Sequence, residues 1–263
     1  MSTSIKILRY ELSNVLRSRW VLVYTLLLLL LTDALFRFGG SGSRAILSLL
    51  NVVLILVPLV SVVFGTMYLY HSREFIELLL AQPVSRRSLY GGLYGGVVVP
   101  LCGAFLAGVG LPLIWGARGE AGITGALVVL LGSGTLLTLV FTGLAFLVAL
   151  RFEDRAKGLG LAILLWLVTG LLWDAFILFI VASFGDYPLE TPVLALTMLN
   201  PVDLARILLL LQFDIAALMG YTGAVFERFF GSALGITLSV GALMVWTLVP
   251  AIWGARRFER KDF

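Results

Sequence analysis

The chain has few of the side chains that perform catalysis or bind metal ions. Its 263 residues include one histidine, His71, and one cysteine, Cys102. One cysteine excludes an internal disulfide, and Cys102 and His71 cannot form a catalytic pair because they lie at different depths of separate apolar runs. Met67 and His71 are one helical turn apart, but two ligands are too few for a metal site. We therefore expect neither a catalytic residue nor a metal site in this chain.

Charged residues are also scarce. They make up 13% of the chain, whereas a soluble domain has about 25%. Hydrophobic residues make up 60%, and the mean hydropathy is +1.05. The sequence therefore predicts an integral membrane protein. The net charge of +4 does not indicate nucleic-acid binding, because the basic residues border the apolar runs, where membrane orientation and anionic lipid explain them.

Six apolar runs are long enough to cross a membrane. A helix needs roughly 17 to 25 residues to span about 30 Å of hydrocarbon. The runs cover residues 20–36, 46–70, 90–115, 122–150, 158–184 and 232–253. We predict an all-α integral membrane protein in which residues 1–263 form a single transmembrane domain with six spans.

Lysine and arginine are distributed unequally between the two sides of this arrangement. Fourteen of the nineteen fall on the side that holds both chain ends, and five fall on the other. Because short cytoplasmic loops retain lysine and arginine during insertion, we predict a multi-pass protein of the inner membrane with both termini cytoplasmic. No A-x-A-like cleavage site follows the first run, so this run is expected to remain as a signal anchor.

Residues 1–19 have the pattern of an amphipathic helix. Apolar residues at helical spacing alternate with basic and polar ones; the apolar positions are Ile5, Leu8, Leu12, Val15 and Leu16. Such a helix lies on the inner membrane surface with its basic groups at anionic headgroups. It serves either as a passive anchor or as a docking site for a cytoplasmic partner.

The cytoplasmic loop 71–89 contains a predicted short helix. Ser72 is a suitable N-cap, and Pro83 ends the helix after about three turns. An apolar stripe runs beside two acidic residues; together these positions are Glu74, Phe75, Glu77, Leu78 and Leu79. This helix is either a well-capped structural loop or a rigid element that a soluble motor protein contacts.

The outer segment 185–231 includes a seventh apolar stretch, residues 202–226, which we do not expect to span. It contains four strongly polar residues, Asp203, Arg206, Gln212 and Asp214. Each ionised group at mid-membrane costs roughly 2.5 to 3.5 kcal/mol, and a seventh crossing would move the basic C-terminus outside. We predict short interfacial or re-entrant helices, one beginning at Asn200 as N-cap with Pro201 in the first position.

Two acidic residues lie within predicted spans. Asp33 is four residues before Arg37, so the two are expected to form an ion pair near the headgroups. Asp174 has no basic residue within a helical turn. An ionisable residue in a span indicates a functional site by default, so Asp174 is a candidate for the transport pathway or gate. The alternative is a structural role, either hydrogen-bonded to a neighbouring helix or protonated.

Glycines at the start of the third run predict close helix packing. Gly91, Gly92, Gly95 and Gly96 form overlapping G-x-x-x-G spacings, and Gly231 and Gly235 repeat the spacing at the sixth run. The packing is either within one chain or across a dimer.

Taken together, the amphipathic N-terminus, the six spans, the loop and the outer helices resemble the ABC-2 type transporter permeases. The most specific part is an E-x-x-x-L-L-x-x-x-P-x-x-R pattern in the loop, matched by Glu74, Leu78, Leu79, Pro83 and Arg86. Residues 200–206, with the sequence NPVDLAR, are similar to the membrane subunit of the Nos-type transporters that serve nitrous oxide reductase maturation.

The resemblance implies a homodimer that works with cytoplasmic ABC ATPase subunits, and a role in copper-enzyme maturation. No G-x-x-x-x-G-K-[ST] motif occurs in the chain, so no cofactor is expected in it, and ATP and Mg are expected in the partner ATPase. The resemblance also implies that Glu74, Phe75, Glu77 and Leu78 couple to the ATPase. It further implies a periplasmic accessory protein, for which Asn200, Asp203 and Arg206 are the candidate outer surface.

Other functions are compatible with parts of this pattern. A permease of the same superfamily that exports a lipid, drug or polysaccharide is the nearest alternative. An intramembrane enzyme is disfavoured because the chain has no second histidine and no Ser/His couple at plausible depth. A secondary transporter is disfavoured because neither inverted repeats nor broken helices are evident in the sequence.

Overall fold

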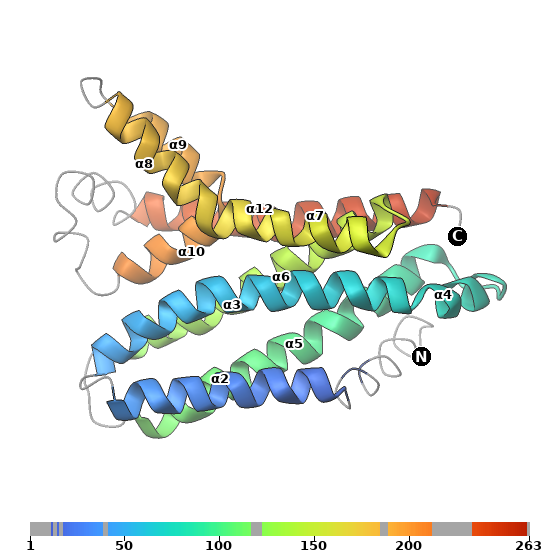
Figure 1. Ribbon diagram of the computed structural model, residues 1–263, viewed down its shortest axis with the longest axis horizontal. Coiled ribbons are helices and arrows are strands. Elements are labelled where there is room, and N and C mark those ends of the chain that lie inside the picture. Colours follow the sequence, from blue (N-terminus) through green and yellow to red (C-terminus); the bar gives the residue numbers. More distant parts are fainter. Residues whose placement is uncertain are drawn as a thin grey trace.

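The computed structural model describes residues 12, 15, 18–38, 42–116, 123–184, 189–211 and 233–261. Within these ranges the chain is helical and contains no strand (Figure 1). Most of the predicted N-terminal interfacial helix lies outside the described residues, as do residues 185–188 and 212–231 of the outer segment.

Six spans are present, as the apolar runs predict. Five of them are, or lie within, single helices: α2 (Arg19–Phe38), α3 (Gly42–His71), α5 (Arg86–Gly116), α6 (Ile123–Arg151) and α12 (Ala233–Arg260). The fifth span is composite, because α7 (Arg155–Leu167) continues through a π-helix, η1 (Val168–Leu172), into α8 (Trp173–Ser183). The fold class predicted from the sequence is therefore confirmed.

Helix α6 is at the centre of the bundle. It packs against α3, α5, α7, α10 (Pro201–Leu210) and α12, while α2 packs mainly against α5. Its large side chains Phe141 and Phe146 are completely buried. The buried hydroxyl of Thr138 donates to the carbonyl of Gly134 at 2.9 Å, which satisfies a polar group that has no water to bond in hydrocarbon.

The fifth span is packed much less completely. Only 6% of its most apolar window is buried within the chain, compared with 50% for α6. A long apolar helix with so few contacts in its own chain has most of its surface available to lipid or to another subunit. In contrast to α6, this span therefore borders the bundle.

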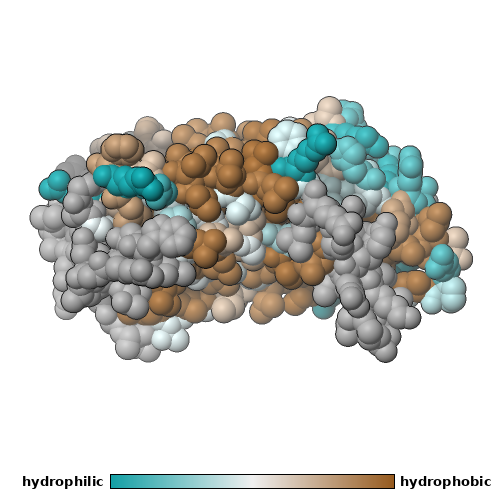
Figure 2. Space-filling model, turned by 90° about the horizontal axis from the view of Figure 1, so that it is seen from below, coloured by the Kyte–Doolittle hydropathy of each residue, from teal (hydrophilic) through white to brown (hydrophobic). Residues whose placement is uncertain are grey.

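A short helix, α4 (Arg73–Leu80), follows α3 directly. It has two turns instead of the predicted three, and the Ser72 side chain makes no capping hydrogen bond. Ile76 is completely buried and anchors the helix on the bundle. Together with the α6–α7 turn and the C-terminal end of α12, α4 defines what we call the α4 end of the molecule (Figure 1). Figure 2 shows hydrophobic residues across the middle and hydrophilic ones concentrated at this end.

At the α4 end, hydrogen bonds connect the start of α5 with the ends of α6 and α12. Arg86 donates to the carbonyl of Lys261 at 2.6 Å, and Arg87 pairs with Glu259, so the start of α5 holds the end of α12. The Lys261 ammonium donates to the carbonyl of Leu150 at 3.0 Å. These bonds satisfy carbonyls that the last turn of a helix leaves unpaired. The start of α5 and the ends of α6 and α12 are therefore held together at this end of the molecule.

Candidate functional site

A bent helix pair lies at the opposite end of the fifth span. Helix α9 (Glu190–Met198) returns beside α8, and α10 then leaves at an angle of 107° (Figure 1). Helix α10 enters the bundle and contacts α6, α12 and α3. The pair confirms the prediction of short helices before the last span.

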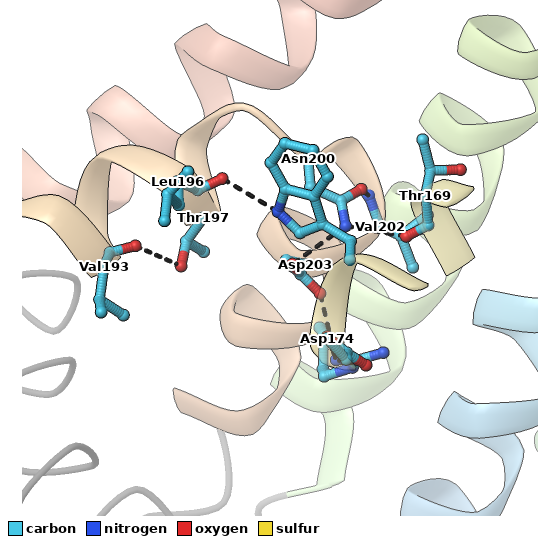
Figure 3. Close-up of polar contacts among 10 residues, drawn as sticks. Thr169, Asp174, Val193, Leu196, Thr197, Asn200, Val202 and Asp203 are labelled. Carbon is cyan, nitrogen blue, oxygen red and sulfur yellow. Dashed lines mark hydrogen bonds and ion pairs between the residues drawn. The ribbon is translucent and has the colours of Figure 1, made fainter. Parts of the chain in front are cut away.

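Asn200 starts α10 and also connects it to the fifth span. Its Oδ1 accepts from the backbone N–H of Val202 at 3.0 Å, which is the N-cap contact that the sequence predicts. Its Nδ2 donates to the carbonyl of Thr169 at 2.8 Å and to Oδ2 of Asp203 at 3.0 Å (Figure 3). Asn200 is completely buried, so these bonds replace all contact with water.

The π-helix provides the carbonyl that Asn200 uses. At the end of η1 the N–H of Trp173 donates to Val168, five residues back. In an α-helix that N–H would donate to Thr169, four residues back, so the π-helix shifts this donor away from the Thr169 carbonyl. Single-turn π-helices of this kind occur often at functional sites.

Asp174 is paired with a basic residue of another helix, which corrects the expectation that it is isolated. One nitrogen of the Arg206 guanidinium, Nη1, lies 2.8 and 2.7 Å from the two carboxylate oxygens of Asp174. The same nitrogen lies 3.1 Å from Oδ1 of Asp203. Two carboxylates from α8 and α10 therefore share one cation, and Asn200 donates to the second of them (Figure 3). We call Asp174, Asp203, Arg206 and Asn200 the polar junction.

The polar junction is partly open. The side chain of Asp203 is 6% exposed, but those of Arg206 and Asp174 are 27% and 46% exposed. With all three charged groups ionised, two carboxylates and one guanidinium sum to a charge of −1. In a medium of low dielectric constant this charge is costly unless water, a cation or another polar chain contacts it. The exposed edge of Asp174 is where such a contact is available.

A second bond fixes α9 against α8. The indole N–H of Trp173 donates to the carbonyl of Leu196 at 3.2 Å, and the ring lies 6.1 Å from that of Phe176. Thr197 is buried and bonds the carbonyl of Val193 within α9 at 2.9 Å. Trp173 and Asp174 are neighbours, so one turn of the fifth span contacts both helices of the bent pair.

The structure places the other candidate residues as follows. On α4, Glu74, Glu77 and Leu78 are exposed, and Phe75 is half-buried. Asn200 and Asp203 were expected on an outer surface, but both are buried and make contacts within the chain. The physical reason is that the cap that starts α10 is also its point of contact with η1. Arg206 is half-buried.

Metal-binding side chains are not gathered in the part of the chain that the structure describes. No three of its histidine, cysteine, aspartate and glutamate residues lie together. His71 uses Nδ1 in a 2.7 Å contact with the carbonyl of Met67, and the free thiol of Cys102 lies within α5.

The sequence did not identify Thr169 or Trp173 as part of the site. Thr169 contributes its backbone carbonyl and Trp173 its indole N–H. Both lie in a span whose sequence is almost entirely apolar, so neither stands out. The available signal was the coincidence of an unpaired acid in one span and an Asp-x-x-Arg pair in the next apolar stretch. Opposite charges in apolar surroundings are expected to pair.

Six apolar spans and a bent helix pair that holds a charged junction define a polytopic membrane protein. The family model described as ABC-2 family transporter protein matches residues 5–263. The chain belongs to the ABC-2 transporter family and is a permease subunit of an ABC transporter.

Two curated relatives are similar over nearly the whole chain. The probable ABC transporter permease protein NosY of Pseudomonas aeruginosa is 32% identical over 267 residues, which cover 94% of this chain and 92% of the relative. The protein of the same name from Stutzerimonas stutzeri is 30% identical over 254 residues, covering 90% and 86%.

Proposed function

We propose that two copies of this chain form the membrane pathway of an ATP-driven transporter whose ATPase subunits, with their ATP and Mg, bind at the α4 end. Membership of the ABC-2 family supports the ATPase partner and the dimer. The absence of a P-loop motif from the sequence requires that ATP be bound by another chain. The excess of lysine and arginine at the α4 end supports a cytoplasmic position for this end and for both termini, in the inner membrane.

Helix α4 has the properties of a coupling element. The side chains that point away from the bundle combine an apolar knob, Leu78, which is 61% exposed, with the acidic residues Glu74 and Glu77. The opposite side is fixed by buried Ile76 and by Arg73, which lies 4.0 Å from Glu153 in the α6–α7 turn. A push on α4 is therefore passed to α6 and to the fifth span.

The fifth span is the proposed wall of the pathway. Of the six spans, it has the smallest share of residues buried within its own chain. Its half-exposed carboxylate, Asp174, would be energetically costly in contact with apolar lipid. A second copy facing this span would remove the acid from lipid and place the polar junction at the centre of a dimer. Asp174 then lines the route or its gate, and α9 and α10 hold it in position.

The names of the relatives support a proposal for the process that the transporter serves. Both carry the name NosY, and residues 200–206 resemble the Nos-type subunit, so we propose a role in the maturation of a copper enzyme, nitrous oxide reductase. A periplasmic accessory protein would dock on the outer segment 185–231. Export of a lipid, drug or polysaccharide is the second candidate, favoured by the broad apolar surface of the fifth span.

The observation that carries the proposal is the exposed apolar and acidic surface of a helix anchored to the bundle. The test is copurification of the ATPase subunit with Leu78→Ala, compared with Leu199→Ala at the corner between α9 and α10, away from the α4 end. The two leucines are similarly exposed, at 61% and 59%. We expect Leu78→Ala to weaken ATPase binding and Leu199→Ala to leave it unchanged. Equal ATPase recovery with both variants would exclude α4 as the docking element.

A further inference from the structure

A cavity of about 650 Å³ opens at the α4 end, between the end of α6 and the end of α12. Five cationic side chains and one carboxylate line it: Arg151, Arg256, Arg257, Arg260, Lys261 and Glu153. This cavity is separate from the polar junction, which lies at the other end of the fifth span. It is also separate from the exposed side of α4.

Among the residues that the structure describes, carboxylates do not balance the positive charge of the cavity. Within the part of the chain that the structure describes, none of the four cavity arginines is within ion-pair distance of a carboxylate. Of the nearby carboxylates, Glu259 pairs with Arg87, and Glu153, which lines the cavity, lies 4.0 Å from Arg73. An anion in the cavity would therefore meet several guanidinium groups with free donors, the arrangement that best binds phosphate.

Crowding of like charges also affects the lysine of the cavity. Burial lowers the pKa of Lys261, and the neighbouring Arg73 and Arg257 lower it further, while Glu153 raises it. The ammonium group already donates to the carbonyl of Leu150. A bound anion would relieve the repulsion that this group experiences.

The surface that leads to the cavity is apolar and faces away from the bundle. On α12, Val245, Val249 and Ile252 are all exposed, and Trp253 is 60% exposed at the cavity wall. One helical turn further, Arg256 and Arg260 continue the same face of the helix. Tryptophan followed by basic residues at the end of an apolar span is typical of the membrane–water boundary. An acyl chain along this face would bring its headgroup to the arginines.

We propose that this cavity is a binding site for the phosphate headgroup of an anionic phospholipid. The continuity of the apolar face of α12 with the arginines favours lipid over an acidic surface of a soluble partner, which would need no apolar path. Bound in this way, the lipid would connect the end of α6 with the end of α12, at the α4 end of the molecule. Its headgroup would add negative charge beside the five cationic side chains.

The test is native mass spectrometry of the full-length protein in neutral detergent with equal amounts of phosphatidylglycerol and phosphatidylcholine. We expect the unaltered protein to retain phosphatidylglycerol preferentially. The double variant Arg256→Gln/Arg260→Gln should retain roughly tenfold less, because each basic residue near an anionic headgroup contributes several-fold to binding. Both arginines are exposed, so the variant should fold. Arg155→Gln/Lys157→Gln, which removes two exposed cations outside the cavity, is the matched control and should behave like the unaltered protein.

Three results would overturn the proposal. Equal loss of phosphatidylglycerol in the cavity variant and the control would mean that only the overall charge matters. Retention of inorganic phosphate by the unaltered protein without selection of phosphatidylglycerol would assign the cavity to free phosphate. Unchanged lipid retention in the cavity variant, together with loss of ATPase copurification, would assign it to an acidic partner surface.

Discussion

The carboxylate of Asp174 on α8 accepts two hydrogen bonds, of 2.7 and 2.8 Å, from one nitrogen of Arg206 on α10. The two residues are 32 positions apart in the sequence, and their pairing joins the fifth span to the helix that enters the bundle. Since Arg206 also contacts Asp203, removal of the cation and removal of one acid should have very different effects.

Arg206→Gln should destabilise the protein more than Asp174→Asn. The arginine variant leaves two carboxylates close together without a cation, whereas the asparagine variant leaves Arg206 paired with Asp203. In a double-mutant cycle we expect a coupling of about 1 to 2 kcal/mol, reduced from that of a fully buried pair because both side chains are partly exposed. Unfolding by denaturant in detergent measures it. Additive effects of the two substitutions would show that the contact has no energetic weight.

Asp174→Asn should also separate structure from function. The variant preserves the shape of the side chain and should retain a well-assembled complex. If Asp174 lines the pathway, transport or enzyme maturation should fall sharply at normal expression. Full activity in the assembled Asp174→Asn complex would assign the residue a structural role only. Asp33→Asn is the control, because Asp33 pairs with Arg37 at 2.7 Å within α2 and should leave activity unchanged.

Asn200 should be intolerant of substitution because it performs two tasks. Asn200→Ala removes the cap and leaves the carbonyl of Thr169 and a buried oxygen of Asp203 without a donor, a loss of about 2 to 4 kcal/mol. Asn200→Ser can still cap α10 but cannot reach both other partners, so it should cost about 1 kcal/mol less. Thermal unfolding of the two variants in detergent compares them. Equal melting temperatures for Asn200→Ala and Asn200→Ser would mean that the cap contributes nothing.

A local sequence pattern predicts contacts within one helix but not contacts between distant helices. The start of α10 was predictable because Asn200 and Pro201 act on their own helix turn. The ion pair of Asp33 and Arg37 was predictable for the same reason, since both lie on one helix face. The partner of Asp174 was not, because it comes from a helix whose direction depends on a 107° bend. The π-helix, whose Thr169 carbonyl accepts from Asn200, was likewise not predictable, because an apolar run does not indicate it.

Gly108 should be sensitive to substitution, although no sequence pattern singles it out. A Cβ at this position would lie 2.7 Å from Cβ of Leu28 and 2.9 Å from the backbone oxygen of Thr25, so α2 and α5 approach too closely for alanine. Gly108→Ala should destabilise the protein by about 1 to 3 kcal/mol. Gly103→Ala on the same helix meets nothing within 4 Å and should be neutral or stabilising by up to about 1 kcal/mol. Unfolding in detergent distinguishes them, and equal stabilities would contradict the α2–α5 contact.

The glycines of the G-x-x-x-G pattern at the start of α5 lie on different faces of the helix: Gly92 and Gly96 are buried, and Gly91 is exposed. An added Cβ at Gly91 would meet nothing within 4 Å in this chain. Close approach depends on which face of a helix meets a neighbour, and a spacing alone does not fix that face. Gly91 therefore has space for a neighbour from lipid or from a second copy.

The last prediction concerns the orientation of the bundle in the membrane. Phe38, which ends α2, and Ser85, which precedes α5, are both exposed and lie at opposite ends of the molecule. In a Cys102→Ser background, a membrane-impermeant thiol reagent added to intact cells should label Phe38→Cys and not Ser85→Cys, because fourteen of the nineteen basic residues would otherwise have crossed the membrane. Permeabilised cells should show labelling of both, which confirms that each thiol is accessible. Labelling of Ser85→Cys in intact cells would place α4 outside, where no ATPase could reach it, and would refute both the orientation and the proposed coupling.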